Sequence, residues 1–377
     1  MESSGSPGFS PAERPRGWRL AAAVGAPAAA LAAGLALAAC TTPDGLGYYW
    51  QGAAGQLEIL AHSEPMAEAM DRSDPRLAAR LKDVEAIRGY ASHALALPNN
   101  ASYTRYADLG RRFVTWNVFA APRLELAPLQ WCFPVAGCVD YRGYFDEDAA
   151  RREATKLAAA GDDVYVGGVP AYSTLGWFDD PVLSTFVHWP LPEVARLIFH
   201  ELAHQVLYVR DDSVFNESFA TMVSDVGLER WLAARGDPAL EAEAARDARL
   251  RATFHQLVVE TRKRLAEIYA SDEPVQAKQR DKAAAFAAMH ASYEAAKAGE
   301  PGLAGYDRWF AAKPNNASLA AVAIYTQRIP AFRAILRDEG NDLPRFYARV
   351  RVIAAMNKPA RDRVLDEAAA SAMRASR

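Results

Sequence analysis

Two histidines and a glutamate within five residues combine metal binding with proton transfer. His200, Glu201 and His204 form the sequence His-Glu-Leu-Ala-His, which is an HExxH motif. Apolar residues recur around it at helical spacing, and in a helix residues four apart differ by only about 40° around the axis. Both imidazoles therefore project from one face, about 6 Å apart at their Cβ atoms, and form two corners of a tetrahedral zinc site.

Glu201 has the position of a general base in this motif. It lies about 100° around the helix from His200, so its carboxylate leans over the open coordination position. There it can accept a proton from the attacking water, whose pKa a zinc ion lowers to about 7. The chain has only seven histidines, and this arrangement arises by chance on the order of once in a hundred such chains. The alternative is a pair of solvated histidines with an unrelated glutamate between them.

A catalytic zinc site needs a third protein ligand. Leu207 and Arg210 occupy the positions at which the three-histidine class has Gly and His, which excludes that class. Glu217, thirteen residues after His204, lies near the start of a second amphipathic helix. With a rise of about 1.5 Å per residue, two antiparallel helices would bring Glu217 level with His204. We therefore expect Glu217 to be the third ligand.

Three further acidic residues near Glu217 are less informative. Asp211 and Asp212 belong to the turn between the two helices, where acidic residues commonly cap a helix. Asp225 follows Glu217 by two helical turns, and it either orients a zinc-bound imidazole or is a surface carboxylate. Both readings of Asp225 remain open at the level of the sequence.

The elements that must position these residues can be predicted from hydrophobic patterns. Residues 48–97 have a helical pattern, whereas residues 113–169 contain three runs rich in β-branched and aromatic residues. We expect a helix at 146–160, between the last two runs. The C-terminal half is helical almost to its end, with long helices at 239–270 and 277–298. The predicted fold class is α+β, with a small mixed β-sheet, one crossover helix, the HExxH helix and mostly helical N- and C-terminal parts.

Composition sets the broad class of protein. The chain has 377 residues, with 43 basic and 46 acidic side chains and a formal net charge of −3. This balance argues against a strongly cationic surface, and therefore against nucleic acid as a partner. A hydrophobic fraction of 51% with 24% charged residues excludes a disordered chain.

The first forty residues predict export and a lipid anchor. Three arginines precede an apolar run at 20–39, which has the pattern of a secretory signal and also the length of a membrane anchor. The tetrapeptide 37–40, Leu-Ala-Ala-Cys, resembles the bacterial lipobox, whose cysteine is lipidated and becomes the first residue of the mature chain. Two threonines directly follow Cys40, in place of the aspartate that retains lipoproteins at the inner membrane, and by resemblance to lipoproteins this favours the outer membrane. The alternative is that Cys40 is a small residue in an uncleaved anchor helix.

Several motifs together resemble a known family. The HExxH segment, followed by Asn-Glu-Ser-Phe-Ala at 216–220, resembles the gluzincin metallopeptidases, in which two histidines and a glutamate bind zinc. More narrowly, the chain resembles the bacterial putative aminopeptidase lipoprotein family. The matching stretches cover nearly all of the mature chain and are the lipobox, 48–51, 131–138, 141–145, 171–181 and the zinc segment.

The resemblance implies a zincin-like fold and a zinc-dependent peptidase whose substrate is a peptide and which faces the periplasm from its lipid anchor. Aminopeptidase action is itself a family-level inference. The alternatives are an envelope zinc endopeptidase and a non-catalytic lipoprotein with a structural zinc site. We expect five segments, which are a signal peptide 1–39, a tether 40–47, an N-terminal helical segment 48–110, a catalytic core 111–235 and a C-terminal helical region 236–377.

Peptide hydrolysis also needs a hydrogen-bond donor for the developing oxyanion. Tyr325 lies in a later helix that could fold over the zinc, and it is the candidate for this catalytic role. Tyr144 and Tyr172 compete with it from the side of the sheet. Each of the three can equally be an amphipathic core residue.

An aminopeptidase must in addition recognise a free α-amine, normally with a carboxylate. Asp179 and Asp180 follow a candidate edge strand at 171–177, which could hold an extended peptide. The sequence Asp-Asp-Pro is also a common turn. Asp179, together with Tyr172, is the candidate substrate-binding pair.

Cys132 and Cys138 flank a segment of five residues. In an oxidising envelope compartment two nearby cysteines favour a disulfide. A metal role would need more soft ligands than the neighbourhood supplies. With Cys40 as the lipid-bearing residue, the pair accounts for all three cysteines of the chain.

Overall fold

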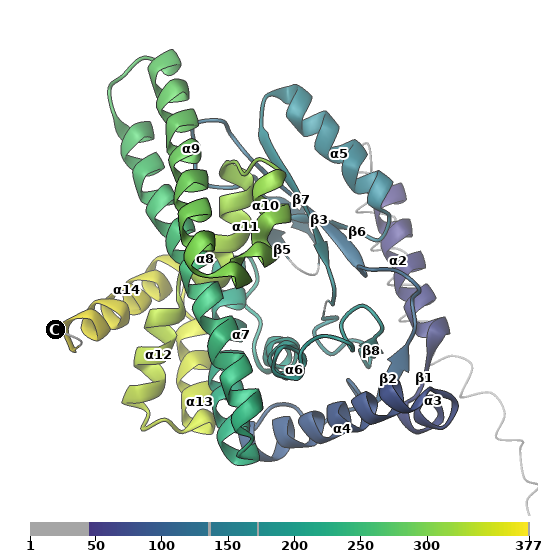
Figure 1. The fold of residues 1–377 in the computed structure, drawn as a ribbon. Coiled ribbons are helices and arrows are strands. Elements are labelled where there is room, and N and C mark those ends of the chain that lie inside the picture. The colour runs from purple at the N-terminus through teal and green to yellow at the C-terminus, as the bar shows by residue number, and fades with distance from the viewer. Residues whose placement is uncertain (1–44, 135–136, 172, 376–377) are drawn as a thin grey trace, which may run out of the picture. The chain divides into compact units, whose positions relative to one another are not determined.

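The computed structural model describes residues 45–134, 137–171 and 173–375 (Figure 1). By its internal contacts the chain divides into two units, Met1–Ala53 and Ala54–Arg377. Helix α2 spans Gly45–His62 and begins in the first unit, whereas the elements that follow it belong to the second. The expected signal peptide and Cys40 lie outside the described residues.

The N-terminal part of the second unit is mainly helical, as the sequence predicts. After the short strand β1 (Ser63–Pro65), helix α3 spans Met66–Arg72 and helix α4 spans Pro75–Leu95. Asp74 begins α4, because its side chain accepts hydrogen bonds from two backbone N–H groups in the first turn. The buried face of α4 joins the main hydrophobic core through Leu81, Val84, Ile87, Ala91 and Leu95.

A three-stranded sheet with the order β6-β3-β7 is antiparallel throughout. β3 spans Thr115–Ala121, β6 spans Arg142–Tyr144 and β7 spans Asp163–Val169. Because both outer strands are antiparallel to β3, they run parallel to each other on either side of it. Helix α5 (Glu147–Ala160) connects these two strands (Figure 1). The predicted crossover helix is present. The predicted mixed sheet is wrong for these strands, because β3 separates the two parallel ones.

Parallel pairing occurs instead in a smaller sheet. β2 (Arg105–Ala107) pairs antiparallel with β1 and parallel with β8 (Val182–Leu183). β4 (Trp131–Phe133) and β5 (Gly137–Val139) form a separate antiparallel hairpin. Strands of two or three residues are too short to show an alternating pattern, which is why the sequence did not separate these sheets.

The edge strand expected at 171–177 is a loop in the described residues of that segment. Leu175 and Gly176 have φ values of 57° and 82°, and this left-handed conformation cannot continue a strand. The buried carboxylate of Asp180 closes the loop, because it accepts hydrogen bonds from the backbone N–H and the hydroxyl of Thr174. Tyr172 lies outside the described residues.

The main hydrophobic core is built from helices distant in sequence. Helix α6 (Leu191–Val206) and helix α7 (Ser213–Arg235) contribute most of their buried side chains to it. Helices α12 (Ile329–Asp338), α13 (Leu343–Ala354) and α14 (Lys358–Ala375) contribute from the C-terminal end. The apolar stripe predicted for α6 is present, since Val194, Ile198 and Leu202 are fully buried.

The two long helices predicted after α7 correspond to α8 (Pro238–Ala270) and α9 (Val275–Gly299). They share a hydrophobic cluster with the 3-10 helix Pro301–Tyr306 and with α10 (Asp307–Ala311). In this cluster the rings of Tyr293 and Phe310 stack with their centroids 3.8 Å apart. Each of the two helices therefore buries one face in this cluster.

Helix α11 (Asn316–Thr326) links this region to the sheet. Its Ala317, Ala321 and Ile324 pack with Phe119 and Ala121 of β3 in a third apolar cluster. In Figure 1, α11 lies on one side of β3 and β7 and α5 on the other. Among the helices of the described ranges, not one has both the length and the apolar character needed to cross a bilayer.

Candidate metal centre

Helices α6 and α7 bring two imidazoles and one carboxylate together. Nε2 of His200 lies 3.1 Å from Nε2 of His204. Oε2 of Glu217 lies 3.3 Å from the first of these nitrogens and 3.5 Å from the second. In the described part of the chain, these residues form the one cluster of at least three His, Cys, Asp or Glu side chains that could hold a metal ion. The expected third ligand is therefore in place beside both histidines.

The three separations fit a zinc ion. With ligand bonds of about 2.0–2.1 Å, the edge of a tetrahedral zinc site is about 3.3 Å, and the observed distances of 3.1, 3.3 and 3.5 Å lie around that value. Two imidazole nitrogens and one carboxylate oxygen are also a donor set found in catalytic zinc sites. A fourth corner faces no further ligating side chain of the described residues.

Side chains around the turn between α6 and α7 fix the start of the second helix. Asp212 caps α7 by accepting a hydrogen bond from the backbone N–H of Phe215, and it pairs with Arg361 of α14 at 2.7 Å. Asn216 accepts a hydrogen bond from the backbone N–H of Val209 and donates one to its carbonyl, each at 2.7 Å. These contacts hold the residues immediately before Glu217.

The sequence interpretation missed the roles of Asn216 and Arg361. Asn216 directly precedes Glu217, and the Asn-Glu dipeptide was the available signal for it. Arg361 gave no signal, since its partner Asp212 lies 149 residues earlier in the chain. For Asp212 the expected helix-capping role is present in the structure.

The two glutamates of the centre have opposite pKa shifts. Burial raises the pKa of Glu217, but His204 and His200 outweigh it and lower the value to about 2. For Glu201, burial raises the pKa to about 8, with further contributions from the charges of Glu217 and Asp180 and an opposing one from His204. The surroundings of Glu217 thus favour its ionised form, whereas those of Glu201 favour the protonated form.

The two histidines also differ. Burial lowers the pKa of His200, and the neighbouring His204 lowers it further, although Glu217 opposes both. For His204, burial acts in the same direction but is outweighed by the carboxylate of Glu217, so its pKa is raised. A neutral imidazole is the form that binds a metal. The carboxylate of Glu217 therefore disfavours the neutral form of His204 in the absence of a metal ion.

Tyr325 lies beside the metal centre, as predicted. Its ring centroid is 6.1 Å from that of His200. Burial, followed by the charges of Glu217 and nearby groups, raises its pKa well above 10, so the phenol keeps its proton. Tyr144 packs in the sheet beside the guanidinium of Arg142, 5.6 Å from its ring centroid. Tyr325 is thus placed with its ring beside the imidazole of His200.

The structure gives Asp225 neighbours other than the imidazoles. Its Oδ2 lies 3.9 Å from the guanidinium of Arg333. Burial raises its pKa, and the charges of Arg196 and Arg333 oppose that shift. The Nδ1 of His204, which a second carboxylate would have to contact, is buried without a hydrogen-bond partner among the described residues. Asp225 therefore fits a bridge between helices better than an orienting role.

Asp179 and Asp180 have different surroundings in the loop that follows Ala171. Asp179 is exposed, next to the exposed Trp177 and Phe178. Asp180 is buried, and burial raises its pKa to about 6 against the hydrogen bonds from Thr174 and Ser173. Of the two, Asp180 is the one whose charge reaches Glu201.

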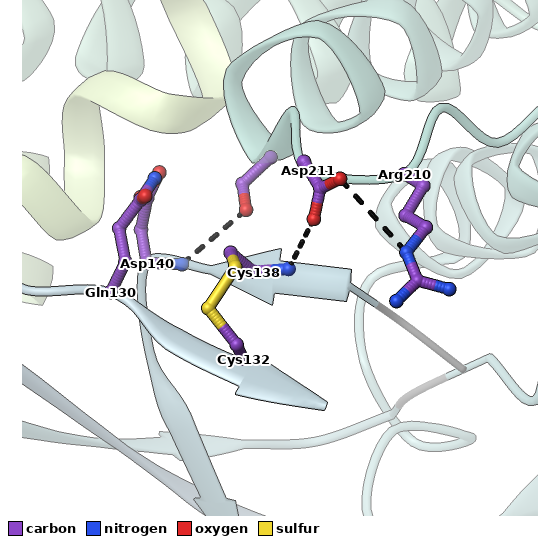
Figure 2. Close-up of a disulfide and its surroundings, with 7 residues drawn as sticks. Gln130, Cys132, Cys138, Asp140, Arg210 and Asp211 are labelled. Atoms are coloured by element: carbon purple, nitrogen blue, oxygen red, sulfur yellow. Dashed lines mark hydrogen bonds and ion pairs between the residues drawn. A yellow bond between two sulfur atoms is a disulfide. The ribbon is translucent and has the colours of Figure 1, made fainter. Parts of the chain in front are cut away.

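The predicted disulfide is present between Cys132 and Cys138 (Figure 2). The two cysteines are direct partners across the β4–β5 hairpin. The hairpin contacts the turn between α6 and α7, since the backbone N–H of Cys138 donates a hydrogen bond to Asp211. The sequence did not predict this contact.

Comparison with known proteins gives one match. A family model described as putative aminopeptidase matches residues 47–365. No curated protein and no solved structure matches the sequence. Since the matched stretch covers most of the chain, the chain belongs to the putative aminopeptidase family.

Proposed function

We propose that the chain is a zinc-dependent peptidase with a zincin-like arrangement of its two metal-binding helices. The observation that carries the proposal is the convergence of two Nε2 atoms and one Oε2 atom at 3.1–3.5 Å, with the buried Glu201 next to them. A structural zinc site would need a fourth protein ligand. The described residues supply three.

In the proposed reaction His200, His204 and Glu217 hold the zinc ion. When bound, zinc polarises the peptide carbonyl and lowers the pKa of the attacking water. Glu201 accepts the proton of that water as the C–O bond forms and transfers it to the leaving amine as the C–N bond breaks. The phenol of Tyr325 donates a hydrogen bond to the carbonyl oxygen as negative charge develops on it.

We propose aminopeptidase action as the specific activity, in line with the family to which the chain belongs. An aminopeptidase requires the free α-amine of its substrate, whereas an endopeptidase does not. A pair of peptides that differ only in N-terminal acetylation separates the two. We expect turnover of the free peptide and at least a tenfold slower turnover of the acetylated one, and equal rates would indicate an endopeptidase.

Glu201→Gln is the variant that tests the proposal. The amide keeps the size of the side chain but cannot accept the proton, so kcat should fall by about 10²–10⁴. Zinc content should remain near one ion per chain, because the three ligands are unchanged. Glu241→Gln, at an exposed position in the first turn of α8, is the matched control and should keep wild-type activity. A Glu201→Gln protein with full zinc and full activity would falsify the mechanism.

We also propose that the protein is attached to the cell envelope through a lipid on Cys40 and faces the periplasm, with the outer membrane as its site. The support comes from the sequence, in which a basic segment, an apolar run and Leu-Ala-Ala-Cys follow one another. The peptide substrate would then be found in the same compartment.

A further inference from the structure

The β4–β5 hairpin contacts the turn that joins the two metal-binding helices at several points. The backbone N–H of Cys138 donates a hydrogen bond of 2.6 Å to Oδ1 of Asp211. In return, Nη1 of Arg210 donates one of 2.8 Å to the carbonyl of Pro134. Figure 2 shows Arg210 and Asp211 on the turn, directed at the hairpin that the disulfide closes.

A further contact reaches helix α7 itself. The backbone N–H of Asp140, just after β5, donates a hydrogen bond of 3.4 Å to the hydroxyl of Ser213, the first residue of α7. The side chain of Asp140 is held by Gln130, whose amide donates a bond of 3.0 Å to its carboxylate (Figure 2). The residues that flank the hairpin are therefore bonded to each other, and Asp140 also contacts the start of α7.

Gly137 shows how closely the hairpin and the turn approach each other. A Cβ at this position would lie 2.4 Å from Cγ of Arg210 and 2.4 Å from Oδ1 of Asp211. The backbone of Gly137 has a φ of 78°, which also disfavours any other residue. Asp211 has a φ of 65°, so the turn too is held in a conformation that a free chain seldom adopts.

The contacted turn separates the ligands of the metal centre. His204 lies in the last turn of α6, and Glu217 lies about one helical turn after Ser213. A shift of the start of α7 would change the distances of 3.3 and 3.5 Å between Glu217 and the two imidazoles. Small shifts matter here, because loss of a residue that supports a ligand commonly lowers metal affinity by about 10–100-fold.

We propose that the disulfide-closed hairpin is a positioning element of the metal centre, which holds the Glu217 carboxylate against the α6 imidazoles through Asp211 and Ser213. The inference rests on the proposed zinc site. It adds a dependence of metal affinity on the oxidation state of Cys132 and Cys138, since the S–S bond is the covalent closure of the hairpin.

The first test removes the contact and leaves the ligands in place. Asp211→Gly deletes the acceptor but tolerates the left-handed backbone, whereas Asp211→Asn keeps both an acceptor and that tolerance. We expect zinc affinity, measured by competition with a chromophoric chelator, to fall about tenfold in the glycine variant. The asparagine variant should remain within about threefold of wild type. Asp108→Ala, which removes a comparable bond to the backbone N–H of Gly110, should bind zinc like wild type.

The second test opens the disulfide. A water-soluble phosphine reduces the S–S bond to two thiols and is itself oxidised to the phosphine oxide, with water supplying the oxygen atom and the two hydrogens. Dithiols are avoided because thiolates bind zinc themselves. Reduction should weaken zinc binding of the wild type by a factor similar to that of Asp211→Gly. It should have no effect on the double variant Cys132→Ser/Cys138→Ser, which should already be weakened.

The melting temperature of each metal-free protein separates positioning from general destabilisation. A positioning role predicts lower zinc affinity with a metal-free melting temperature close to that of the wild type. Unchanged zinc affinity in both Asp211→Gly and the reduced wild type overturns the inference. If the wild type itself binds no zinc, the proposed function fails and the inference fails with it. If the wild type binds zinc and hydrolyses peptides, but zinc affinity is unchanged in Asp211→Gly and after reduction, the inference fails and the proposed function stands.

Discussion

Glu201 and Glu217 are chemically identical, yet the centre prepares them for different tasks. Both are buried, and burial raises the pKa of each. Glu217 contacts both imidazoles, which stabilise its negative charge. The negative charges of Glu217 and Asp180 instead disfavour a negative charge on Glu201. Ionisable groups whose environments separate their pKa values are a common sign of divided acid and base roles. The division agrees with Glu217 as ligand and Glu201 as proton carrier.

Tyr325→Phe tests the oxyanion role proposed for the phenol. The change removes one oxygen and leaves the ring beside His200, so we expect kcat to fall about 100-fold with zinc affinity unchanged. The rate with a saturating peptide substrate measures this effect. Tyr293→Phe is the control with the opposite expectation, because its hydroxyl bonds to Leu303 and Asp307 far from the centre. It should lower stability by about 1–2 kcal/mol and leave kcat unchanged.

Asp180 gives a pH dependence of stability with a defined sign. Burial raises its pKa from 3.8 to about 6, with Asp179 adding a like charge and Glu201 facing it as another acidic group. Because the pKa is higher in the folded state, the fold binds the proton more tightly, and stability rises as pH falls from about 6 to about 4. Relative to Asp180→Asn, the wild type should gain up to about 3 kcal/mol between pH 7 and pH 4.

Denaturant unfolding of the wild type and Asp180→Asn across this pH range measures the dependence. Asp179→Asn, at the exposed neighbouring position, is the control and should follow the wild-type profile. Parallel profiles for the wild type and Asp180→Asn would show that the ionisation of Asp180 does not limit stability.

The clustering of His200, His204 and Glu217 could be predicted from the sequence because these residues are close together along the chain. An i, i+4 pair has a fixed geometry in any helix, and the rise per residue places Glu217 within reach. The role of Asp225 could not be decided in this way. Its neighbour Arg333 comes from α12, more than a hundred residues later, and no helical period shows which face meets that helix. The contact of Asp211 could not be predicted for the same reason, since its partner Cys138 lies 73 residues earlier.

At the scale of elements, the helices were predicted well because the residues that end a helix and form its apolar face lie within or next to that helix in the sequence. Asp146, for example, caps α5 at the position where the pattern of a helix begins. The segment after Ala171 was predicted incorrectly, because its shape depends on the buried carboxylate of Asp180 and on left-handed residues. Those features override the strand preference of the aromatic residues.

Close packing of three helices around Gly227 gives a prediction at this scale. A Cβ at Gly227 of α7 would lie 2.8 Å from Leu95 of α4 and 2.9 Å from the ring of Phe199 of α6. Alanine improves helix propensity by about 1 kcal/mol, but overpacking costs about 1–3 kcal/mol. We expect Gly227→Ala to lower the free energy of unfolding by about 1 kcal/mol in denaturant titrations.

Gly89→Ala in α4 is the matched control. A Cβ there meets no atom within 4 Å, so the propensity gain has no opposing contact. It should raise the free energy of unfolding by about 0.5–1 kcal/mol. Equal stabilisation by both substitutions would mean that Leu95 and Phe199 can move aside without cost, and that the three helices are packed less tightly than the distances indicate.

At the scale of the whole molecule, the chain combines a small antiparallel sheet with a large helical part, and the centre lies on the helices α6 and α7. Three separate apolar clusters hold these parts together internally. The α+β class followed from composition and periodicity. The distribution of strands among three sheets depends on long-range pairing, such as β2 with β8, which no local pattern encodes.

Cys40→Ala tests whether anchoring and catalysis are separate properties of the molecule. The residues of the metal centre all belong to the unit Ala54–Arg377, which begins after Cys40 in the sequence. Burial of an acyl chain in a bilayer contributes about 0.8 kcal/mol per CH₂ group, so a lipid on Cys40 should hold the processed wild type in the membrane fraction. We expect the wild type to require detergent for release and to incorporate a labelled fatty acid, and the variant to incorporate none.

Activity on soluble peptides should be the same for the variant and the detergent-released wild type, because no residue of the centre changes. The mass of the purified wild-type chain provides an independent check, since cleavage before Cys40 removes the first 39 residues. A wild-type chain that retains those residues and incorporates no fatty acid would instead show that the apolar run at 20–39 is an uncleaved anchor. In that case Cys40 is an ordinary small residue, and the lipid proposal fails without affecting the metal centre.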